Sequence, residues 1–305
     1  MRFGVNLPNY GPATTPASML EWARRLEDLG YHQLMVSDHV ASTSEVETLF
    51  PAPFYDPFTV LAWLAGATSR VRLGTTVTIL PYRHPLLVAR QVANIDRLSE
   101  GRFVFGAAAG WAPGEFAALG VPYARRGARS NEYLRVMKAF WTQDVIEHDG
   151  EFVSFGPVRT GPRPVRPGGP EIWIGGHSAG ALQRAVRYGD AWHPTSVTAD
   201  WLVHAGVPAL RDIAKRLNRP VPALAPRIKL RLTERPLPAG RVLGEGTLEQ
   251  IHEDLGLLER LEAEAVILDP TFPAQVRTAA RAEADLSALE RLAAEVIDLE
   301  HGRLR

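Results

Sequence analysis

The sequence predicts an α/β fold of the TIM (β/α)8 barrel type with insertion segments, formed as a single domain by residues 1–305. Two observations predict it. The segment from Leu73 to Gly110 has the pattern of a strand, a helix and a second strand, and similar units recur along the chain. Polar residues and glycines follow the predicted strands, where barrel enzymes keep their active sites. An open doubly wound sheet is the alternative arrangement of such units.

Composition excludes several classes of function. The 34 basic and 34 acidic residues cancel, so nothing indicates a nucleic-acid partner. No apolar run reaches ~18 residues, which argues against a membrane span, and Met1 leads directly into a predicted strand rather than into a signal peptide. The absence of cysteine excludes disulfides, thiolate nucleophiles and cysteine-bound metal centres. We therefore expect a cytoplasmic enzyme that acts on a small molecule and has no metal site.

The first half of the chain alternates predicted strands and helices. A buried strand from Phe3 to Leu7 precedes a helix that begins after the N-cap candidate Thr15 and ends before Gly30. The further elements expected up to residue 141 are a strand at 33–36, a helix from Asp56-Pro57, a strand at 73–80, a helix at 85–98, a strand at 103–107 and a helical region at 115–141 that breaks near Pro122.

Residues 142–170 are expected to form an insertion that contains a hairpin. Val145 and Ile146 would face Phe152 and Val153 across a turn at 148–150, followed by a loop rich in proline and glycine. The barrel units then resume with strands at 171–174, 191–192, 227–232 and 265–268, and with helices that begin near Ser178, at the capping box Thr247 to Gln250, and at Ala282, the last one running to Glu300.

The C-terminal ends of the eight predicted strands carry most of the polar candidates for a site. No Walker A loop, HExxH motif or G-x-S-x-G motif occurs, so a pocket at the strand ends is the remaining site for chemistry. In chain order the strand ends hold Asn6, Asp38-His39, Thr76-Val77, Gly110-Trp111, Gly175-Gly176-His177, His193, Thr233 and Asp269.

His39 and Asp38 are the predicted catalytic residues. Histidine titrates near neutral pH, and a position at a strand end would expose His39 to the pocket. Asp38 is expected to accept hydrogen bonds from nearby backbone rather than to transfer protons. The alternative is that Asp38 only caps a loop and His39 is only a polar wall.

Glycines and cations suggest anion binding at two places. Gly175 and Gly176 end a strand and open a helix, where backbone amides and the helix dipole attract a phosphate, although any tight strand-to-helix turn uses glycine. His177 is either a further donor or a solvated loop residue. Three cations alternate along one predicted strand: Arg227, Lys229 and Arg231. If their side chains point into the barrel, they need acidic partners or an anionic ligand; otherwise they lie on an exposed strand.

Several single residues have a structural and a functional interpretation. Trp63 is expected in the core, whereas Trp111 and Trp192 either contact a planar ring or pack in the core. His84 is expected to be no more than a neighbour of a helix N-cap. Glu115 either supplies an acid to the pocket or, as we expect, anchors its own loop to nearby arginines, namely Arg125, Arg126 or Arg129.

Four segments together resemble a known family, the bacterial luciferase-like flavin-dependent oxidoreductases, and most of all its branch that uses the deazaflavin coenzyme F420. They occur in the family's order over most of the chain: VSDHV (Val36 to Val40), LGTTVTILPYRHPLLVARQVANIDRLSEGRFVFGAAAGW (Leu73 to Trp111), EFAALGVPYARRGARSNEYL (Glu115 to Leu134) and PEIWIGGHSAGALQRAVRYGDAWHP (Pro170 to Pro194).

This resemblance implies a cofactor across the C-terminal mouth of the barrel, with His39 near the reactive position of its ring. A non-prolyl cis peptide, frequent in the family, would fall at Thr76-Val77 and support the ring. Trp111 stands where some sugar-phosphate dehydrogenases of the family carry a catalytic glutamate, which argues against their mechanism here. The expected cofactor contacts are Asn6, Thr76, Val77, Gly110, Trp111, Gly175, Gly176 and His177.

We therefore expect an oxidoreductase that uses coenzyme F420 and transfers hydride to or from a small organic substrate. The alternative is a luciferase-like monooxygenase that uses FMNH2. The two cofactors imply different reactions, because the 5-deaza ring of F420 lacks the nitrogen that supports oxygen chemistry. A non-catalytic cofactor-binding subunit is a third reading, since the family includes such subunits. The resemblance also implies a homodimer, and the segment 144–169 would shape the substrate pocket.

Overall fold

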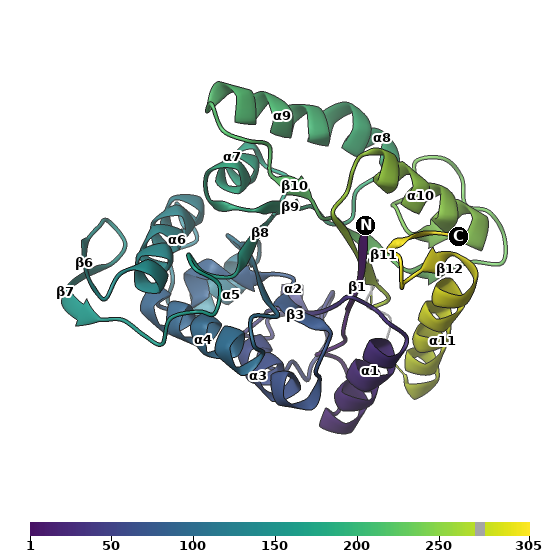
Figure 1. Ribbon diagram of the computed structural model, residues 1–305, viewed down its shortest axis with the longest axis horizontal. Coiled ribbons are helices and arrows are strands. Elements are labelled where there is room, and N and C mark those ends of the chain that lie inside the picture. The colour runs from purple at the N-terminus through teal and green to yellow at the C-terminus, as the bar shows by residue number, and fades with distance from the viewer. Residues whose placement is uncertain (272–277) are drawn as a thin grey trace.

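The central feature of the computed structural model, which describes residues 1–271 and 278–305, is a ring of parallel strands surrounded by helices (Figure 1). All pairs within the main sheet are parallel. In the order of the sheet its strands are β10 (Ala223–Leu224), β9 (Ala191–His193), β8 (Glu171–Gly175), β5 (Phe103–Ala108), β3 (Arg72–Thr75), β2 (Gln33–Val36), β1 (Arg2–Asn6), β14 (Ala265–Asp269) and β11 (Arg227–Lys229), with β4 (Thr78–Ile79) beside β5.

The ring closes because β10 and β11 are two halves of one strand. The first half pairs with β9 and the second with β14, and Pro226 between them has no N–H to donate. The Ala225 N–H still donates to the Trp192 carbonyl at 2.9 Å, and the Ile267 N–H donates to the Pro226 carbonyl at 2.9 Å. The TIM-barrel prediction is therefore confirmed, and the alternative of an open doubly wound sheet is wrong.

Helices surround the barrel, and their ends follow ordinary capping chemistry. Thr15 and Thr247 each form a capping box, and the side chains of Asp56 and Ser178 also cap their helices. The long helices are α1 (Pro16–Asp28), α3 (Pro57–Ala67), α4 (Pro85–Leu98), α6 (Arg126–Thr142), α7 (Ala179–Tyr188), α9 (Val207–Arg216), α10 (Leu248–Arg260) and α11 (Ala279–Glu295).

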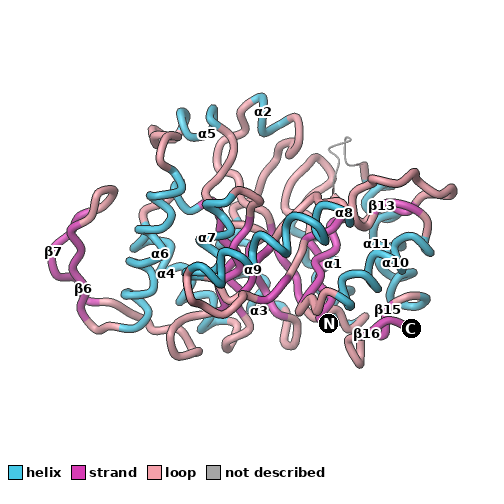
Figure 2. The backbone as a smooth tube through the Cα atoms, turned by 90° about the horizontal axis from the view of Figure 1, so that it is seen from above, coloured by secondary structure: helices cyan, strands magenta, loops and turns pink. Residues whose placement is uncertain are grey.

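Short elements mark the two ends of the barrel. The helices α2 (Ser44–Glu47) and α5 (Pro113–Ala118) lie together at one end, and both chain termini lie at the other (Figure 2). The other short helices are η1 (Leu80–Tyr82), α8 (Ala199–Trp201) and η2 (Leu202–Gly206). No helix among the described residues has the length and apolar character that crossing a membrane requires.

Two predicted strands are interrupted. The strand expected at 73–80 breaks between β3 and β4 at Thr76-Val77, where the peptide bond is cis, as the family resemblance implied. The strand expected at 227–232 leaves the barrel after Lys229, because the Arg231 N–H donates to Gly244. Its end forms β12 (Arg231–Leu232) with β13 (Glu245–Gly246).

The insertion forms the predicted hairpin, but the turn expected at 148–150 was wrong. Strands β6 (Val145–Asp149) and β7 (Ser154–Arg159) pair so that Ile146 faces Val158, not Phe152 or Val153. The buried Glu132 carboxylate accepts hydrogen bonds from the N–H groups of residues 151–153, so these residues form the tip. The hairpin projects from the barrel at one side (Figures 1 and 2).

Two further expectations were wrong. The last helix ends at Glu295 rather than Glu300, because the chain turns so that the buried Ile297 enters a small antiparallel pair, β15 (Ile297–Asp298) with β16 (Arg303–Leu304). Trp63 was expected in the core but is 39% exposed on α3. The expected helical region 115–141 does break near Pro122, between α5 and α6.

Candidate active site

A pocket of about 580 Å³ lies at the C-terminal ends of the barrel strands. Eight of the ten predicted site residues line it: Asp38, His39, Thr76, Val77, Gly110, Trp111, Gly175 and Gly176. Asn6 and His177 do not. Asn6 is fully buried below the pocket and bonds to Asp269, whereas His177 accepts from the Thr195 N–H and contacts the ring of Trp201.

His39 is held by a buried carboxylate. Its Nδ1 lies 2.7 Å from Glu115 Oε2, and the same carboxylate accepts hydrogen bonds from the Tyr82 hydroxyl at 2.8 Å and from the Val40 and Ala41 N–H groups. When Nδ1–H donates to Glu115, the other ring nitrogen, Nε2, has no hydrogen-bond partner among the described residues. The arrangement therefore leaves one ring nitrogen available in the pocket.

Electrostatics keep Glu115 ionised. Burial raises the pKa of this carboxyl, but the hydrogen bonds from His39, Val40 and Ala41 outweigh burial and bring its pKa below the ordinary value. Burial and the neighbouring Glu115 raise the pKa of Tyr82 far above its ordinary value, so Tyr82 stays a donor. The expectation that Glu115 anchors its loop to arginines was wrong, because its partners are His39, Tyr82 and two backbone amides.

Asp38 accepts the hydrogen bond from nearby backbone that the sequence predicted. Its carboxylate accepts from the Ile79 N–H at 2.9 Å and forms a two-pronged ion pair with Arg83, at 2.8 and 2.9 Å. Arg83 also reaches Asp56 at 2.9 Å. Both oxygens of Asp38 are thus engaged, and they fix the segment that follows the cis peptide.

The pocket floor depends on glycine. A Cβ atom on Gly106 would lie 1.8 Å from the Thr75 carbonyl oxygen, so no other residue fits beside the bulge at Thr76-Val77. The Val77 side chain reaches towards Gly175, where an added Cβ would lie 3.3 Å from two of its methyl carbons. Trp192 is fully buried and donates to the Gly176 carbonyl at 2.9 Å, so it packs in the core rather than facing the pocket.

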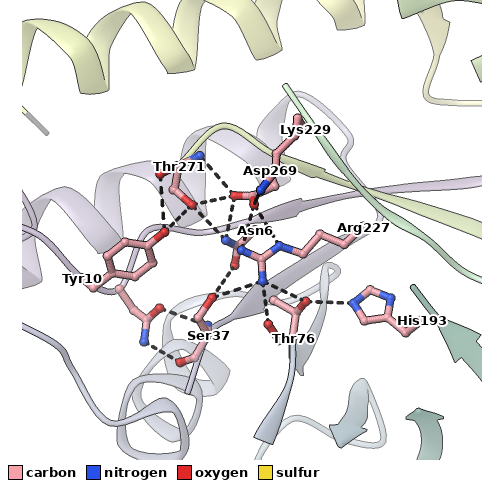
Figure 3. Close-up of polar contacts among 10 residues, drawn as sticks. Asn6, Tyr10, Ser37, Thr76, His193, Arg227, Lys229, Asp269 and Thr271 are labelled. Carbon is pink, nitrogen blue, oxygen red and sulfur yellow. Dashed lines mark hydrogen bonds and ion pairs between the residues drawn. The ribbon is translucent and has the colours of Figure 1, made fainter. Parts of the chain in front are cut away.

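A buried ionic cluster supports the floor from below (Figure 3). The Arg227 guanidinium donates to Asp269 at 2.9 and 3.0 Å and to the Thr76 carbonyl at 2.7 Å, and Lys229 lies 3.3 Å from Asp269. The inward cations thus have an acidic partner, one of the two outcomes expected for that orientation. Arg231 instead pairs with Glu245 near the surface.

The cluster perturbs its own ionisation. Burial raises the pKa of Asp269, but Arg227 and Lys229 outweigh burial and hold it well below the ordinary range. Burial lowers the pKa of Lys229 to about 8, against the opposing effect of Asp269. Burial also lowers the pKa of His193 to about 4, so its neutral ring donates to the Ala225 carbonyl and accepts from the Thr76 hydroxyl.

Cations and backbone amides line the part of the pocket beside β8 and α7. Arg125, Arg126 and Arg184 line it, beside Gly175-Gly176 and the first turn of α7. Arg184 is 4% exposed and donates to Asn131 and to the Gly127 carbonyl, and no carboxylate among the described residues pairs with it. Burial and the charge of Arg126 lower the pKa of Arg184 to about 10. We call this the anion end of the pocket; it has the donors that a phosphate needs.

The family model for luciferase-like monooxygenases matches residues 1–236. The chain belongs to this family. An uncharacterized protein of Mycobacterium tuberculosis is 33% identical over 226 residues, 70% of this luciferase-like chain and 78% of its own length. An FMNH2-dependent dimethylsulfone monooxygenase of Pseudomonas putida is 34% identical over 145 residues, 47% of this chain and 39% of that protein.

Solved structures of the luciferase-like fold agree with the barrel. The coenzyme F420-dependent tetrahydromethanopterin reductase of Methanopyrus kandleri superposes with a TM-score of 0.78 at 17% identity and covers 99% of each chain. This identity supports the shared fold alone. Among the described residues of this luciferase-like chain, no group of three or more histidine and carboxylate side chains is arranged to hold a metal ion.

The sequence did not assign Arg83 and Arg184 to the site, and it left Glu115 as the less favoured pocket acid without indicating its contact with His39. Glu115 lies 76 residues from His39, and only the packing of α5 against the loop after β2 brings the two together. Arg184 is one of several helix arginines, and nothing in its spacing distinguishes it. A signal did exist for Arg83, which follows the predicted strand end by a few residues in the segment that resembles the family.

Proposed function

We propose that this chain is an oxidoreductase that uses the deazaflavin coenzyme F420, with a small organic molecule as its substrate. The observation that carries the proposal is the anion end of the pocket, where Arg125, Arg126 and Arg184 converge beside the Gly175-Gly176 turn. Arg125 already pairs with Glu151, whereas Arg126 and Arg184 have no carboxylate partner among the described residues, so these two cations are available to the anionic tail of a cofactor.

The residues present fit such a cofactor. Gly176 has φ +108°, a conformation that side chains disfavour, and its turn precedes the free amides of α7. The buried Arg184 has neutral partners only, so a phosphate would supply the negative charge that it lacks. Thr76 and Val77 line the pocket between the two ends, where the ring system of such a cofactor would lie.

The bound cofactor would supply or accept a hydride, and the protein's own residues would handle the proton. His39 presents Nε2 to the pocket, so it can give a proton to a substrate oxygen or take one from it. Glu115 holds the ring in the orientation that this transfer needs. Asp38 and Arg83 keep the strand end rigid and do not exchange protons with substrate.

A second candidate is a monooxygenase that uses FMNH2. The similarity to FMNH2-dependent dimethylsulfone monooxygenases favours it, since identity reaches 34% over nearly half of this chain. The same pocket would then hold the shorter cofactor, and oxygen would be the co-substrate. A non-catalytic subunit is disfavoured by the His39–Glu115 pair, because a binding protein has no need of a poised histidine.

Titration of the purified protein with F420 and with FMN, by cofactor fluorescence, tests the proposal. We expect F420 to bind more tightly than FMN. Arg184→Gln removes a charged donor at the phosphate, worth about 1.5–3 kcal/mol, so F420 affinity should fall about 10- to 100-fold. Arg187→Gln is the matched control, because Arg187 is exposed on the same helix α7 and does not line the pocket.

Two outcomes would contradict the proposal in different ways. Tight binding of FMNH2 without F420 affinity, together with oxygen uptake, would establish the monooxygenase instead. Failure of both cofactors to bind a folded protein would remove the flavin-type function altogether.

A further inference from the structure

One of the three arginines at the anion end is held by a residue from outside the pocket. The guanidinium of Arg125 forms an ion pair with the carboxylate of Glu151, which lies between the strands β6 and β7 of the hairpin. Residues 144–169, which were expected to shape the substrate pocket, do not line it, whereas Arg125 does. The insertion therefore reaches the anion end through this one ion pair, and it places a negative charge there.

The tip of the hairpin is fixed in a position that presents Glu151 to Arg125. The buried carboxylate of Glu132, on α6, accepts hydrogen bonds at 3.0 to 3.1 Å from the N–H groups of residues 151–153. Only a residue without a side chain fits just before the tip, because a Cβ atom on Gly150 would overlap the same carboxylate. The backbone of the tip is thus attached to α6, the helix that begins directly after Arg125.

A second contact from the tip also positions Arg125. The ring of Phe152 lies 5.3 Å from the guanidinium of Arg125 and 4.8 Å from that of Arg129, so its face attracts both cations. Arg125 has the backbone angle φ +62°, in the left-handed region that favours glycine, yet the chain has an arginine there. Arg125 therefore contacts the hairpin tip through its ion pair and its ring contact, while it also lines the pocket.

The ion pair reduces the positive charge that the pocket offers to a ligand. Arg126 donates to the Gly110 carbonyl and stacks 3.8 Å from the ring of Tyr123, and Arg184 donates to neutral groups, so both keep their net charge. Of the three arginines, only Arg125 pairs with a carboxylate among the described residues. The side chains of this pair are 60% and 49% exposed, so water and salt weaken their attraction, and another anion can compete for Arg125.

We propose that Glu151 is a specificity residue of the anion end, an inference that rests on the proposed function. Glu151 withholds Arg125 from a bound ligand, so the two cations Arg126 and Arg184 determine how much negative charge on a ligand improves its binding. A ligand with further negative charge must displace Glu151 from Arg125 before it gains a third ionic contact. The hairpin thereby limits the affinity of the pocket for highly charged anions.

Calorimetric titration of the full chain with F420, inorganic phosphate and pyrophosphate tests the inference without any turnover. Glu151→Gln keeps the size of the side chain, removes its charge, and leaves the tip N–H groups bonded to Glu132. At about 50 mM NaCl we expect this variant to bind F420 about two- to fivefold more tightly than wild type, the strength of an exposed ion pair. Pyrophosphate should gain more than inorganic phosphate because it carries more charge, and every gain should become smaller at about 500 mM NaCl.

Two further variants separate this role from a general effect of charge. Glu147→Gln is the matched control, because Glu147 is exposed on β6 of the same hairpin and does not line the pocket; it should leave each affinity within about 1.5-fold. Arg125→Gln, added to Glu151→Gln, should abolish the gain, because the gain requires the released guanidinium.

An affinity that Glu151→Gln leaves unchanged or weakens, or a gain that persists without Arg125, overturns the inference. If F420 fails to bind while pyrophosphate shows the expected pattern, the proposed function is wrong and the role of Glu151 stands. If neither binds, both are wrong.

Discussion

At the scale of single residues, one carboxylate organises the reactive end of the pocket. Glu115 accepts four hydrogen bonds, from His39, Tyr82 and two backbone amides, although its side chain is fully buried. A buried charge is tolerated when every oxygen is engaged in this way. The same contacts lower its pKa, so the site holds its negative charge at neutral pH.

Replacing this carboxylate should reduce stability in a way that depends on pH. Glu115→Gln places an amide donor among groups that themselves donate, at a cost of about 1–3 kcal/mol near pH 7. Because folding lowers the pKa of Glu115, its contribution is full above the unfolded value of about 4.3 and is lost as pH falls. Urea unfolding at pH 7 and at about pH 3.5 should therefore show a smaller difference between variant and wild type in acid.

Glu47→Gln is the control, since Glu47 is exposed on α2. It should change the free energy of unfolding by less than about 0.5 kcal/mol at both pH values. A Glu115→Gln protein as stable as wild type at pH 7 would show that the carboxylate is not needed to hold His39.

The site residues that were predictable are those whose place follows from position along the chain. Asp38 and His39 were identified because they follow a strand, and strand ends meet at one edge of a barrel. The contact between His39 and Glu115 was not predictable, because it depends on how α5 packs over the loop after β2. Local sequence has no information about that contact.

At the scale of elements, the split strand β10–β11 has two roles: it closes the barrel, and it carries residues that support the pocket floor. Its second half carries Arg227 and Lys229 inward against Asp269 at the end of β14. From there Arg227 reaches the Thr76 carbonyl across the barrel. The cluster therefore connects the strand that closes the ring to the bulge beneath the proposed cofactor ring.

Removing the shared anion should destabilise the whole barrel. Asp269→Asn leaves two buried cations without their carboxylate, at a cost of about 3–5 kcal/mol measured by urea unfolding at pH 7. Adding Lys229→Met to this variant should restore part of the loss, because one of the two buried cations that lost the carboxylate of Asp269 is removed. Asp298→Asn is the matched control at an exposed ion pair and should cost less than about 1 kcal/mol.

The acid limb of stability supplies a second check on the same variant. Folding lowers the pKa of Asp269, so its stabilisation is present above about pH 4 and disappears as pH falls through the folded value. The difference in the free energy of unfolding between wild type and Asp269→Asn should become smaller as the pH is lowered. A gap that is small at pH 7, or that widens in acid, would contradict the ionic role of Asp269.

Elements were predictable where local signals dominate and not where distant contacts decide. Thr15, Ser178 and Thr247 cap helices through their own nearest neighbours, so the starts of these helices follow from sequence. The turn of the hairpin does not, because Glu132 on α6 fixes it by accepting from the tip. The break after Lys229 likewise depends on a distant contact, because the Arg231 N–H donates to the Gly244 carbonyl.

At the scale of the whole molecule, the pocket at the barrel mouth has two unlike ends. Arginines and backbone amides form one end, on the side of β8 and α7, and aromatic rings form the other, on the side of β1 and β2. The sequence predicted phosphate binding at the glycine turn and left Trp111 as a candidate contact for a planar ring, but it did not indicate that rings from three separate loops gather at the other end. Dimerisation and cellular location stay predictions.

Ligand binding at the two ends of the pocket should depend differently on salt concentration. Raising NaCl from about 50 to 500 mM shortens the Debye length from roughly 14 to 4 Å and screens the arginines from an anionic cofactor. We expect F420 affinity to fall several-fold, whereas the affinity of acetophenone, an uncharged aromatic probe for the end lined by rings, stays the same or rises. Calorimetric titration at both salt concentrations measures this. Equal salt dependence for the two ligands would mean that the pocket is not divided by charge.

The contact between Gly106 and the Thr75 carbonyl has a consequence for engineering. Because even a methyl group at position 106 would overlap the backbone of the adjacent strand, a mutant library gains nothing by varying that site. Phe50 and Trp111 lie on loops outside the barrel strands and line the pocket, so substitutions there can change which molecules are accepted without altering the barrel beneath.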